Sequence, residues 1–381
     1  MNHLQSDVLE FRSHIARWVD ERLLPQAGRL DEEGEFAFDL FRELGQLGYL
    51  GTMYPESAGG SGVSYPFTCF TVLCEELARG SMGFAAGVCM QGSTATNTLY
   101  EWGNDTLKEL YFAPALRGEK VGAFAITEPN AGSDAASLKT RASRVDGGYV
   151  LNGSKIFTTN GTVADFITVV ATMAPNSAAK GLELFVVDTK SKGFHVGRKL
   201  DKFSVHCSDT AELSFEDLFV PDNHCLGDGK GGGFLKAYKS LTVDRIFTAA
   251  LALGNAQAAY DASVRYARER SQFGQPIGKF QAVQFKLVDM LAKLEQAKVY
   301  TYFASALADR GASITTEAAL AKIIAAENCN QLCQDALSIF GGYGLMNEYP
   351  VQRYLRDSYF PMIGGGTGDI MRLVVARQIG L

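Results

Sequence analysis

The chain has 381 residues, of which 46% are hydrophobic, and a formal net charge of −6. Its length can bury a large core and predicts two or three domains. The acidic balance, without a basic block, excludes nucleic acid as an expected partner. No apolar run reaches the ~18 residues of a membrane span, and residues 1–10 lack the pattern of a signal peptide, so we predict a cytoplasmic protein without a membrane span.

Residues 1–121 are predicted to form an N-terminal helical domain. Apolar residues recur at helical spacing over 8–24, 36–47, 67–78, 84–100 and 106–116. Pro25 follows the first of these segments, and 55–62 is a loop by its glycine and serine content. We expect these helices to serve as scaffold.

The periodicity changes to two in residues 122–229, which predicts a central antiparallel β domain. Asp146-Gly147-Gly148 is typical of a hairpin turn, here between strands over 139–145 and 149–151. Residues 230–381 return to helical spacing. Helices are predicted there over 234–267, 282–310, 316–340 and 369–378. Three of these exceed the usual globular helix, which indicates a bundle with a subunit interface.

One stretch of the β domain, residues 122–140, has the chemistry of a cofactor edge. A short buried strand from Phe124 to Thr127 should end before Pro129, because proline cannot continue a ladder of hydrogen bonds. Small residues and hydroxyls follow over 130–134, so the backbone and Ser133 can lie close to a flat polar ligand. The alternative is an ordinary surface turn.

The seven cysteines are scattered, so we interpret them as reduced thiols. His206-Cys207 and His224-Cys225 are adjacent pairs, whereas the paired ligands of structural zinc sites usually lie two to four residues apart. We predict no metal site.

Five sequence blocks, taken together, resemble the acyl-CoA dehydrogenase family, flavoenzymes that desaturate acyl thioesters. The first block is residues 125–129 (AITEP) with 132–134 (GSD). The others, in the family's order, are 152–155 (NGSK) with 159–161 (TNG), 270–274 (RSQFG) with Gln281, 340–344 (FGGYG), and 366–367 (GT). Together they span almost the whole chain.

The resemblance implies a mixed, mainly α fold with FAD held between the β domain and the C-terminal helical bundle. It further implies an acyl-CoA substrate, electron-transferring flavoprotein or a similar acceptor, and a homotetramer built as a dimer of dimers. The alternating helical, β and helical parts of the sequence agree with that architecture.

The resemblance also implies three groups of FAD-binding residues. The flavin ring would be edged by Phe124, Ile126, Thr127, Ser133, Phe157 and Thr159. The pyrophosphate and adenosine of the neighbouring subunit's FAD would be reached by Arg270, Gln272, Phe273, Phe280 and Gln281. The site would be completed by Ser338, Gly341, Gly342, Thr367 and Asp369. Phe157 replaces a common tryptophan, Ser338 a glutamine and His206 an arginine.

The usual catalytic base of the family is absent. Most relatives carry a glutamate in Tyr-Glu-Gly-Thr, whereas this chain has Gly364-Gly365-Gly366-Thr367. The backbone N–H of Gly365 can still donate to the thioester carbonyl. We expect the missing side chains to leave space beside the substrate Cα, with Ser133, Gly364 and Gly366 lining the substrate site.

A replacement base is available on a predicted helix. Some relatives carry the glutamate in a Glu-Arg pair, and Asp244-Arg245 matches that pair here. Asp244 is the predicted base, and Arg245 matches the family's arginine near CoA. The alternative for Asp244 is a helix carboxylate that only pairs with a neighbouring cation.

Three classes of function stay open at this point. The first is FAD-dependent α,β-dehydrogenation of a short branched or cyclic acyl-CoA. The second is oxidation of an acyl-carrier-protein thioester, or a flavin reaction without an α-proton base, on the same scaffold. The third is a flavin- or thioester-binding protein without catalysis, which the intact flavin blocks disfavour.

Overall fold

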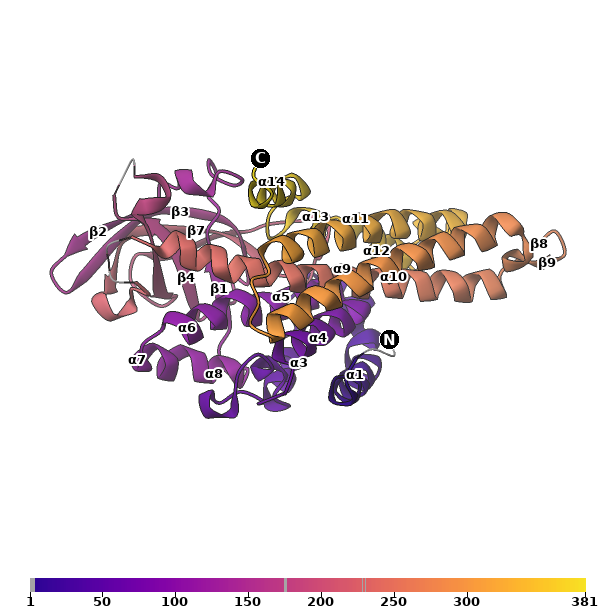
Figure 1. The fold of residues 1–381 in the computed structure, drawn as a ribbon, viewed down its shortest axis with the longest axis horizontal. Helices are drawn as coiled ribbons and strands as arrows, with labels where there is room; N and C mark the ends of the chain where they lie inside the picture. Colours follow the sequence, from indigo (N-terminus) through magenta and orange to yellow (C-terminus); the bar gives the residue numbers. More distant parts are fainter. Residues whose placement is uncertain (1–3, 175–176, 228, 230) are drawn as a thin grey trace.

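The computed structural model describes residues 4–174, 177–227, 229 and 231–381, so residue 230 at the predicted domain boundary lies outside the described part. Helices come first in the sequence, a sheet follows, and helices return (Figure 1). The predicted fold class is confirmed. In Figure 1 the sheet lies at one end of the molecule, and the long C-terminal helices extend away from it as an arm.

The N-terminal helices lie largely where apolar spacing predicted them. They are α1 Ser6–Trp18, α2 Ala27–Glu33, α3 Phe38–Gln46, α4 Pro66–Gly80, α5 Met82–Met90, α6 Thr96–Trp102, α7 Asp105–Leu107 and α8 Ala113–Leu116. The predicted helix over 84–100 is not continuous, because the π-helical turn η5 (Gln91–Ala95) separates α5 from α6. At this turn Gly92 lies so close to the ring of Phe70 that a Cβ would be 2.3 Å from Phe70 Cζ. Such turns change the direction of side chains and recur at functional sites.

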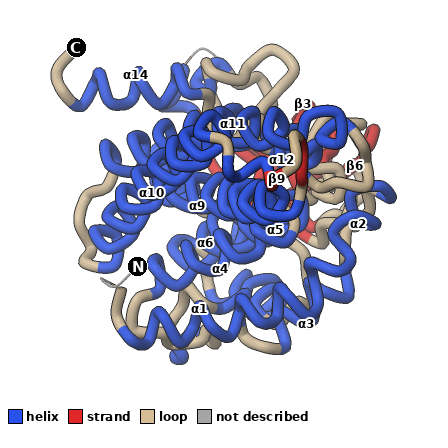
Figure 2. Tube along the Cα trace, turned by 90° about the vertical axis from the view of Figure 1, so that its right-hand side faces the viewer, coloured by secondary structure: helices blue, strands red, loops and turns tan. Residues whose placement is uncertain are grey.

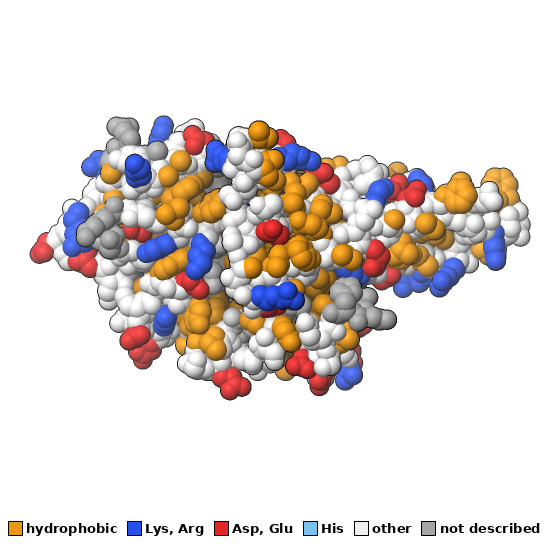
Figure 3. Space-filling view, viewed as in Figure 1, with side chains coloured by type: hydrophobic (Ala, Val, Ile, Leu, Met, Phe, Trp, Pro, Cys, Tyr) orange, Lys and Arg blue, Asp and Glu red, His pale blue; other side chains and the backbone are white. Residues whose placement is uncertain are grey.

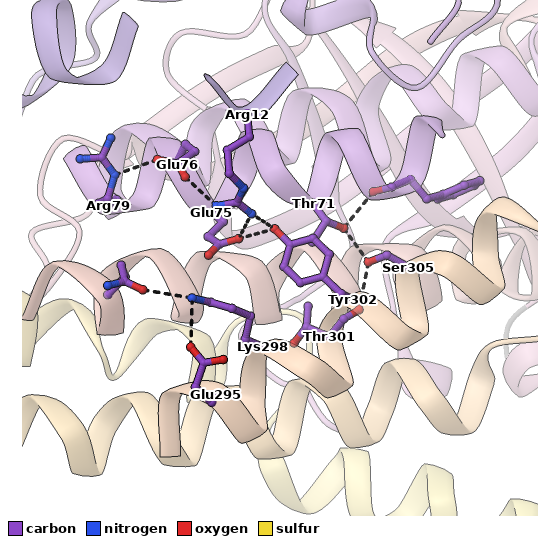
Figure 4. Close-up of polar contacts among 12 residues, drawn as sticks. Arg12, Thr71, Glu75, Glu76, Arg79, Glu295, Lys298, Thr301, Tyr302 and Ser305 are labelled. Carbon is purple, nitrogen blue, oxygen red and sulfur yellow. Dashed lines mark hydrogen bonds and ion pairs between the residues drawn. The ribbon is translucent and has the colours of Figure 1, made fainter. Parts of the chain in front are cut away.

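An ion-pair network fixes α1 to the helices behind it (Figure 4). Arg12 forms ion pairs with Glu75 at 2.6 Å and Glu76 at 2.7 Å, and Tyr302 hydrogen-bonds both Arg12 and Glu75. Lys298, also in Figure 4, donates to Gln257 at 3.1 Å. Because every charge in the network has a partner, its burial is tolerated.

The central sheet contains β1 Gly122–Ala125, β2 Arg141–Val145, β3 Gly148–Thr159, β4 Phe166–Thr172, β5 Leu182–Asp188, β6 Phe194–Lys199 and β7 Thr210–Pro221. The strand order is β1-β4-β2-β3-β7-β6, with β5 paired to β4. The predicted hairpin joins β2 and β3. The expectation of an antiparallel sheet was wrong in part, since β2 pairs in parallel with β4 at Arg141 and Thr172, and β1 and β4 also run parallel. The β2–β3 hairpin lies between them in sequence and makes the connection long enough for a parallel pair.

The C-terminal helices are α9 Gly233–Glu269, α10 Gln281–Asp309, α11 Thr315–Phe340, α12 Val351–Asp357, α13 Phe360–Ile363 and α14 Gly368–Gln378. The helix α9 packs between α4 and α11 (Figure 2). Its residues 244–256 are all buried, which is typical of a helix enclosed on every side. A short hairpin of β8 (Ser271–Gln272) and β9 (Gln275–Pro276) joins α9 to α10 at the tip of the arm (Figure 1).

Apolar side chains remain on the surface of the arm. Phe285, Val288, Val299 and Phe303 of α10 are each at least half exposed. Figure 3 shows apolar side chains gathered over the middle of the molecule and along the arm. Within the described residues, no helix combines the length and the apolar character that crossing a membrane requires.

Candidate functional site

Asp244 lies in the buried part of α9 and is only 8% exposed. Three side chains donate to its carboxylate. Ser93 Oγ donates to Oδ1 at 2.6 Å, Cys89 Sγ to the same oxygen at 3.8 Å, and Thr248 Oγ1 to Oδ2 at 3.5 Å. The carboxylate is therefore held by hydrogen bonds to α5, η5 and its own helix.

The three donors reach Asp244 through local helix geometry. Thr248 follows Asp244 by one helical turn, so both side chains lie on the same face of α9. Ser93 belongs to the π-helical turn η5, and Cys89 lies one turn before it. The widened turn points the Ser93 hydroxyl into the interior, where the side chain has no exposed surface.

The glycine run lies directly against Asp244. A Cβ added to Gly365 would be 3.0 Å from Asp244 Oδ2 and 3.5 Å from Thr248 Oγ1. Gly365 also has φ +67°, a conformation that favours glycine. The structure thus brings together the two residues that the sequence marks as catalytic.

The expected open space beside the glycines is absent in the direction of their missing side chains, and that expectation was wrong. A Cβ at Gly364 would be 3.1 Å from the ring of Phe360, and one at Gly366 would be 2.9 Å from Met371 Cε. Asp244 occupies the corresponding place at Gly365. Neighbouring side chains therefore lie against the positions that a Cβ of each residue would take.

Burial raises the pKa of Asp244 above its usual range, while the hydrogen bond from Ser93 and the charges of Lys322 and Arg245 oppose that rise. Lys322, on α11, donates from Nζ to the carbonyl oxygen of Gly366. Burial lowers the pKa of Lys322 to about 8, against the attraction of Asp244. A buried carboxylate with a raised pKa is suited to accept a proton near neutral pH.

Arg245 is buried next to Asp244 but points elsewhere. Its guanidinium lies 4.9 Å from the ring centroid of Tyr238, and Nη1 donates to Thr242 Oγ1 at 3.5 Å. Its Nε has no hydrogen-bond partner among the described residues. A buried arginine with an unpaired N–H suits an anionic ligand such as a phosphate.

The residues predicted to edge the flavin ring gather where β1 and β3 end. Phe124 is buried in β1, while Ile126 and Thr127 lie just beyond the strand, which ends two residues earlier than predicted. Thr159 is half-buried and Ser133 is exposed. Phe157 has φ +57° and is 65% exposed, so its ring is presented to solvent at a bulge in β3.

A buried ion pair fixes this edge from behind. Lys155 Nζ lies 2.7 Å from Glu128 Oε1 and donates to the carbonyl oxygen of Ile126 at 3.0 Å. Glu128 also accepts from the backbone N–H groups of Lys139 and Thr140, at 2.7 and 2.9 Å. Because the pair is fully hydrogen-bonded, it holds the loop after β1 in one conformation.

The residues predicted to reach a neighbour's FAD lie together at the tip of the arm. Arg270 lies 5.2 Å from the ring centroid of Tyr343, and Phe273 packs edge-on against Phe280 although it is 93% exposed. Gly341 and Gly342 are also there, at the end of α11, with no atom within 4 Å of a Cβ position. Exposed at the tip are also Gln272, Gln281 and Ser338, whose hydroxyl accepts from Lys286.

The tip and the flavin-ring edge do not meet within one chain. At about 1.5 Å per residue, the stretch of α9 from Asp244 to Arg270 spans about 40 Å. By contrast, Thr367 and Asp369 lie next to the glycine run, where Thr367 caps α14 by accepting from the Ile370 N–H at 3.3 Å. Exposed aromatic rings, a guanidinium and open glycine backbone fit FAD chemically, but the two groups lie apart within one chain.

Sequence reasoning missed Ser93, Cys89, Thr248 and Lys322 around Asp244, and the Glu128–Lys155 pair. Two signals were present. Thr248 lies four residues after the predicted base, and Lys322 is a single charge within the apolar run 318–326 (AALAKIIAA). Ser93 carried no such signal, because its direction depends on the π-helical turn.

The chain matches three domains along its length. All three are domains of acyl-CoA dehydrogenase: the N-terminal domain matches residues 5–119, the middle domain 123–218 and the C-terminal domain 231–380.

One similar protein is benzylmalonyl-CoA dehydrogenase of Aromatoleum aromaticum, 48% identical over 96% of each chain. Among solved structures, butyryl-CoA dehydrogenase from Megasphaera elsdenii superposes with a TM-score of 0.96 at 36% identity, covering 99% of both chains. A chain from a structure described as the electron transferring flavoprotein of Acidaminococcus fermentans gives the same TM-score, identity and coverage.

Proposed function

The chain belongs to the acyl-CoA dehydrogenase family, and on that premise we propose that it binds FAD and dehydrogenates a branched or cyclic acyl-CoA with Asp244 as the base. The contact between Asp244 and Gly365 carries the proposal. An added Cβ at Gly365 would lie 3.0 Å from Asp244 Oδ2, so the carboxylate on α9 stands where a side chain from the glycine run would begin. This chain lacks the family's usual C-terminal glutamate, and Asp244 takes over its function.

Each residue of the site has one task in this proposal. Asp244 accepts the proton from the substrate Cα, with Ser93 and Thr248 holding the carboxylate in place. The N–H of Gly365 donates to the thioester carbonyl and stabilises the enolate. Arg245 pairs with CoA, and Ser133, Gly364 and Gly366 line the substrate. When bound, FAD accepts the hydride that leaves Cβ.

The proposal of a branched or cyclic acyl group rests on a similar protein and not on a cavity beside the glycine run. The benzylmalonyl-CoA dehydrogenase that is 48% identical to this chain acts, by its name, on an acyl group with a ring and a branch at Cα. Asp244 is one methylene shorter than the glutamate found in relatives. A substrate must therefore come closer to α9, which a branched group shifted toward the helix achieves.

The FAD site and the oligomer form together. The tip residues, among them Arg270 and Phe273, bind the FAD whose ring lies at Thr127 and Phe157 of another chain. The exposed apolar residues of α10 supply surface for a cytoplasmic homotetramer, a dimer of dimers. An electron-transferring flavoprotein is the electron acceptor, which the similarity to the Acidaminococcus fermentans chain supports.

Anaerobic mixing with CoA thioesters tests the proposal. Purified protein should be yellow, and a panel of butyryl-, isovaleryl-, glutaryl-, cyclohexanecarboxyl- and benzylmalonyl-CoA should bleach the flavin fastest with a branched or cyclic member. Colourless protein that takes up no FAD would remove the cofactor assignment. Equal inertness toward the whole panel would remove the reaction.

A second candidate uses no α-proton base. A benzylmalonyl thioester carries a carboxylate on Cα, and loss of CO₂ leaves the bonding electron pair on Cα, which gives the enolate of the decarboxylated 3-phenylpropanoyl thioester without removal of a proton. The absence of a carboxylate at residues 364–366 favours this route. Stoichiometric CO₂ from benzylmalonyl-CoA, unchanged in Asp244→Asn, would support it over the first.

A further inference from the structure

Lys322 is a buried cation that the proposed reaction leaves without a task. It lies in α11 and is 1% exposed. Its Nζ donates to the carbonyl oxygen of Gly366, and its Cε is 4.0 Å from the Cβ position of Gly365. Lys322 therefore contacts the glycine run through its ammonium group and its aliphatic stem.

The other buried lysines of the described chain differ from Lys322 in their partners. Lys155 has Glu128 at 2.7 Å, and Lys298 has Glu295 at 3.6 Å. No carboxylate among the described residues lies within 4.0 Å of Lys322 Nζ, and the carboxylate whose charge acts on it is Asp244. Burying an ammonium without a close counter-ion is costly, so its retention here calls for an explanation in the site.

We propose that Lys322 is a positioning residue of the site, which holds the glycine run against Asp244 and keeps that carboxylate ionised. The inference rests on the proposed function, because it assigns Lys322 a task in proton abstraction by Asp244. The hydrogen bond to Gly366 fixes the backbone beside Gly365, and the ammonium charge favours the ionised base.

The charges that face Asp244 determine the expected direction of change. Cys89 on α5, Lys322 on α11 and Arg245 on α9 are the titratable or charged groups that act on it. Both cations favour the carboxylate, whereas burial disfavours it. Without the charge of Lys322, the base would ionise at a higher pH, so the pH at which proton abstraction reaches half its maximum would rise.

A cavity of about 250 Å³ lies beside Lys322. It lies among α11, α13 and α14 and is lined by Lys322 together with Glu327, Asp369 and Arg372. Charged side chains therefore line the space next to this lysine, while its Nζ donates to the glycine run.

The test is exchange of the Cα protons of phenylacetyl-CoA with solvent deuterium, followed by mass spectrometry on the FAD-loaded enzyme. Phenylacetyl-CoA has Cα protons but no hydrogen on Cβ, so it reports proton abstraction without dehydrogenation. Lys322→Gln keeps an N–H donor for Gly366 and removes the charge. It should raise the half-maximal pH by about one unit, which is a tenfold loss of rate on the acidic limb.

Three further variants separate the charge from the packing. Lys322→Arg keeps the charge and should keep the pH of the half-maximum. Lys322→Met removes charge and hydrogen bond, and should shift the profile and also lower its plateau about tenfold, because the glycine run loses its anchor. Lys298→Met, a buried lysine far from the site, should leave the profile unchanged.

An unchanged half-maximal pH in Lys322→Gln, with exchange still dependent on Asp244, would overturn this inference alone. An equal shift in Lys298→Met would do the same, because it would show a general effect of removing a buried cation. Exchange in the parent enzyme that does not depend on Asp244 would overturn the proposed function, and this inference with it.

Discussion

The site around Asp244 in α9 and the tip of the arm at Arg270 differ in how many of their contacts come from the chain itself. Around Asp244 the side chains are buried, three donors hold the carboxylate, and the glycine run packs against it. At the tip, about 40 Å away along the helix, the Arg270 guanidinium lies over the ring of Tyr343, and Phe273 is 93% exposed.

The difference indicates which function each end serves. Groups that move a proton must be fixed to within a fraction of an ångström, and one chain can achieve this only by packing them in its own core. Groups that bind the distal part of a dinucleotide need less exact placement, so a second chain can supply them. The helical arm ends in exposed aromatic rings and a guanidinium, far from the residues proposed to edge the flavin ring, and this separation is the reason for proposing a site shared between chains.

Apart from replacement of the base itself, the largest predicted effect concerns FAD binding at the tip. Arg270→Ala removes the charge-assisted contact proposed to the diphosphate, so the Kd for FAD should rise about 10- to 100-fold. Phe157→Asp should have a similar effect at the ring edge, where aspartate tolerates the positive φ of that position. Fluorescence titration of the deflavinated proteins with FAD measures both.

Mixed oligomers then show whether the two ends serve one cofactor from different chains. Differently tagged Arg270→Ala and Phe157→Asp chains are co-expressed and purified through both tags. If each site is built from two chains, one site of a mixed pair has the parent residue at both positions and the other site has both substitutions. Mixed pairs should therefore bind about half as much FAD as the parent. Mixed pairs as flavin-free as either variant would mean that each chain builds its own site.

A second prediction concerns the packing of the inner end. Gly365→Ala places a Cβ 3.0 Å from Asp244 Oδ2 at a residue with φ +67°. The free energy of unfolding should fall by about 1–3 kcal/mol. Flavin reduction should slow about tenfold as Asp244 is displaced. Denaturant unfolding and anaerobic stopped-flow absorbance measure the two effects.

Gly28→Ala is the matched control for that substitution. Gly28 lies in α2 with nothing within 4 Å of its Cβ position, so alanine there should be neutral or slightly stabilising. Equal behaviour of Gly365→Ala and Gly28→Ala would show that the inner end is not tightly packed around the base.

A third prediction concerns the hydrogen bond from Ser93. In the parent protein, the 2.6 Å hydrogen bond from Ser93 lowers the pKa of the Asp244 carboxyl. Ser93→Ala removes this bond, so the pKa of Asp244 should rise. Because a base works when it is deprotonated, the acidic limb of flavin reduction should move to higher pH. A rate several-fold lower at pH 6 but close to the parent at pH 9 is expected, whereas a uniform loss at every pH would indicate a packing effect.

The smallest effect concerns the fold at the tip. Phe273 is 93% exposed, so Phe273→Ala should change the free energy of unfolding of the FAD-free chain by less than about 0.5 kcal/mol. The same substitution should weaken FAD binding. A loss of stability above 1 kcal/mol without a change in FAD affinity would mean that the ring serves its own chain.

Much of the fold and part of the site were predictable from the sequence. Helical spacing located the long helices, and Asp146-Gly147-Gly148 marked the hairpin, because both signals are local. The family resemblance predicted Asp244 and Gly365 in one site, and the structure places the Asp244 carboxylate 3.0 Å from the Cβ position of Gly365.

What the sequence could not show depends on contacts between distant segments. The parallel pairing of β1 with β4 and the π-helical turn at Ser93 follow from tertiary packing, not from local preference. The glycine run was expected to leave space, but Asp244, Phe360 and Met371 fill it from other elements. The composition of a run shows which side chains are missing and not what replaces them.

The most direct test of the account is deuterium exchange at Cα of phenylacetyl-CoA by Asp244→Asn. Asparagine keeps the volume and an oxygen acceptor for Ser93 but cannot take the proton. With FAD still bound, exchange should fall about 10²–10⁴-fold relative to the parent enzyme. Exchange at the parent rate in a fully flavinated Asp244→Asn enzyme would contradict the assignment of Asp244 as the base.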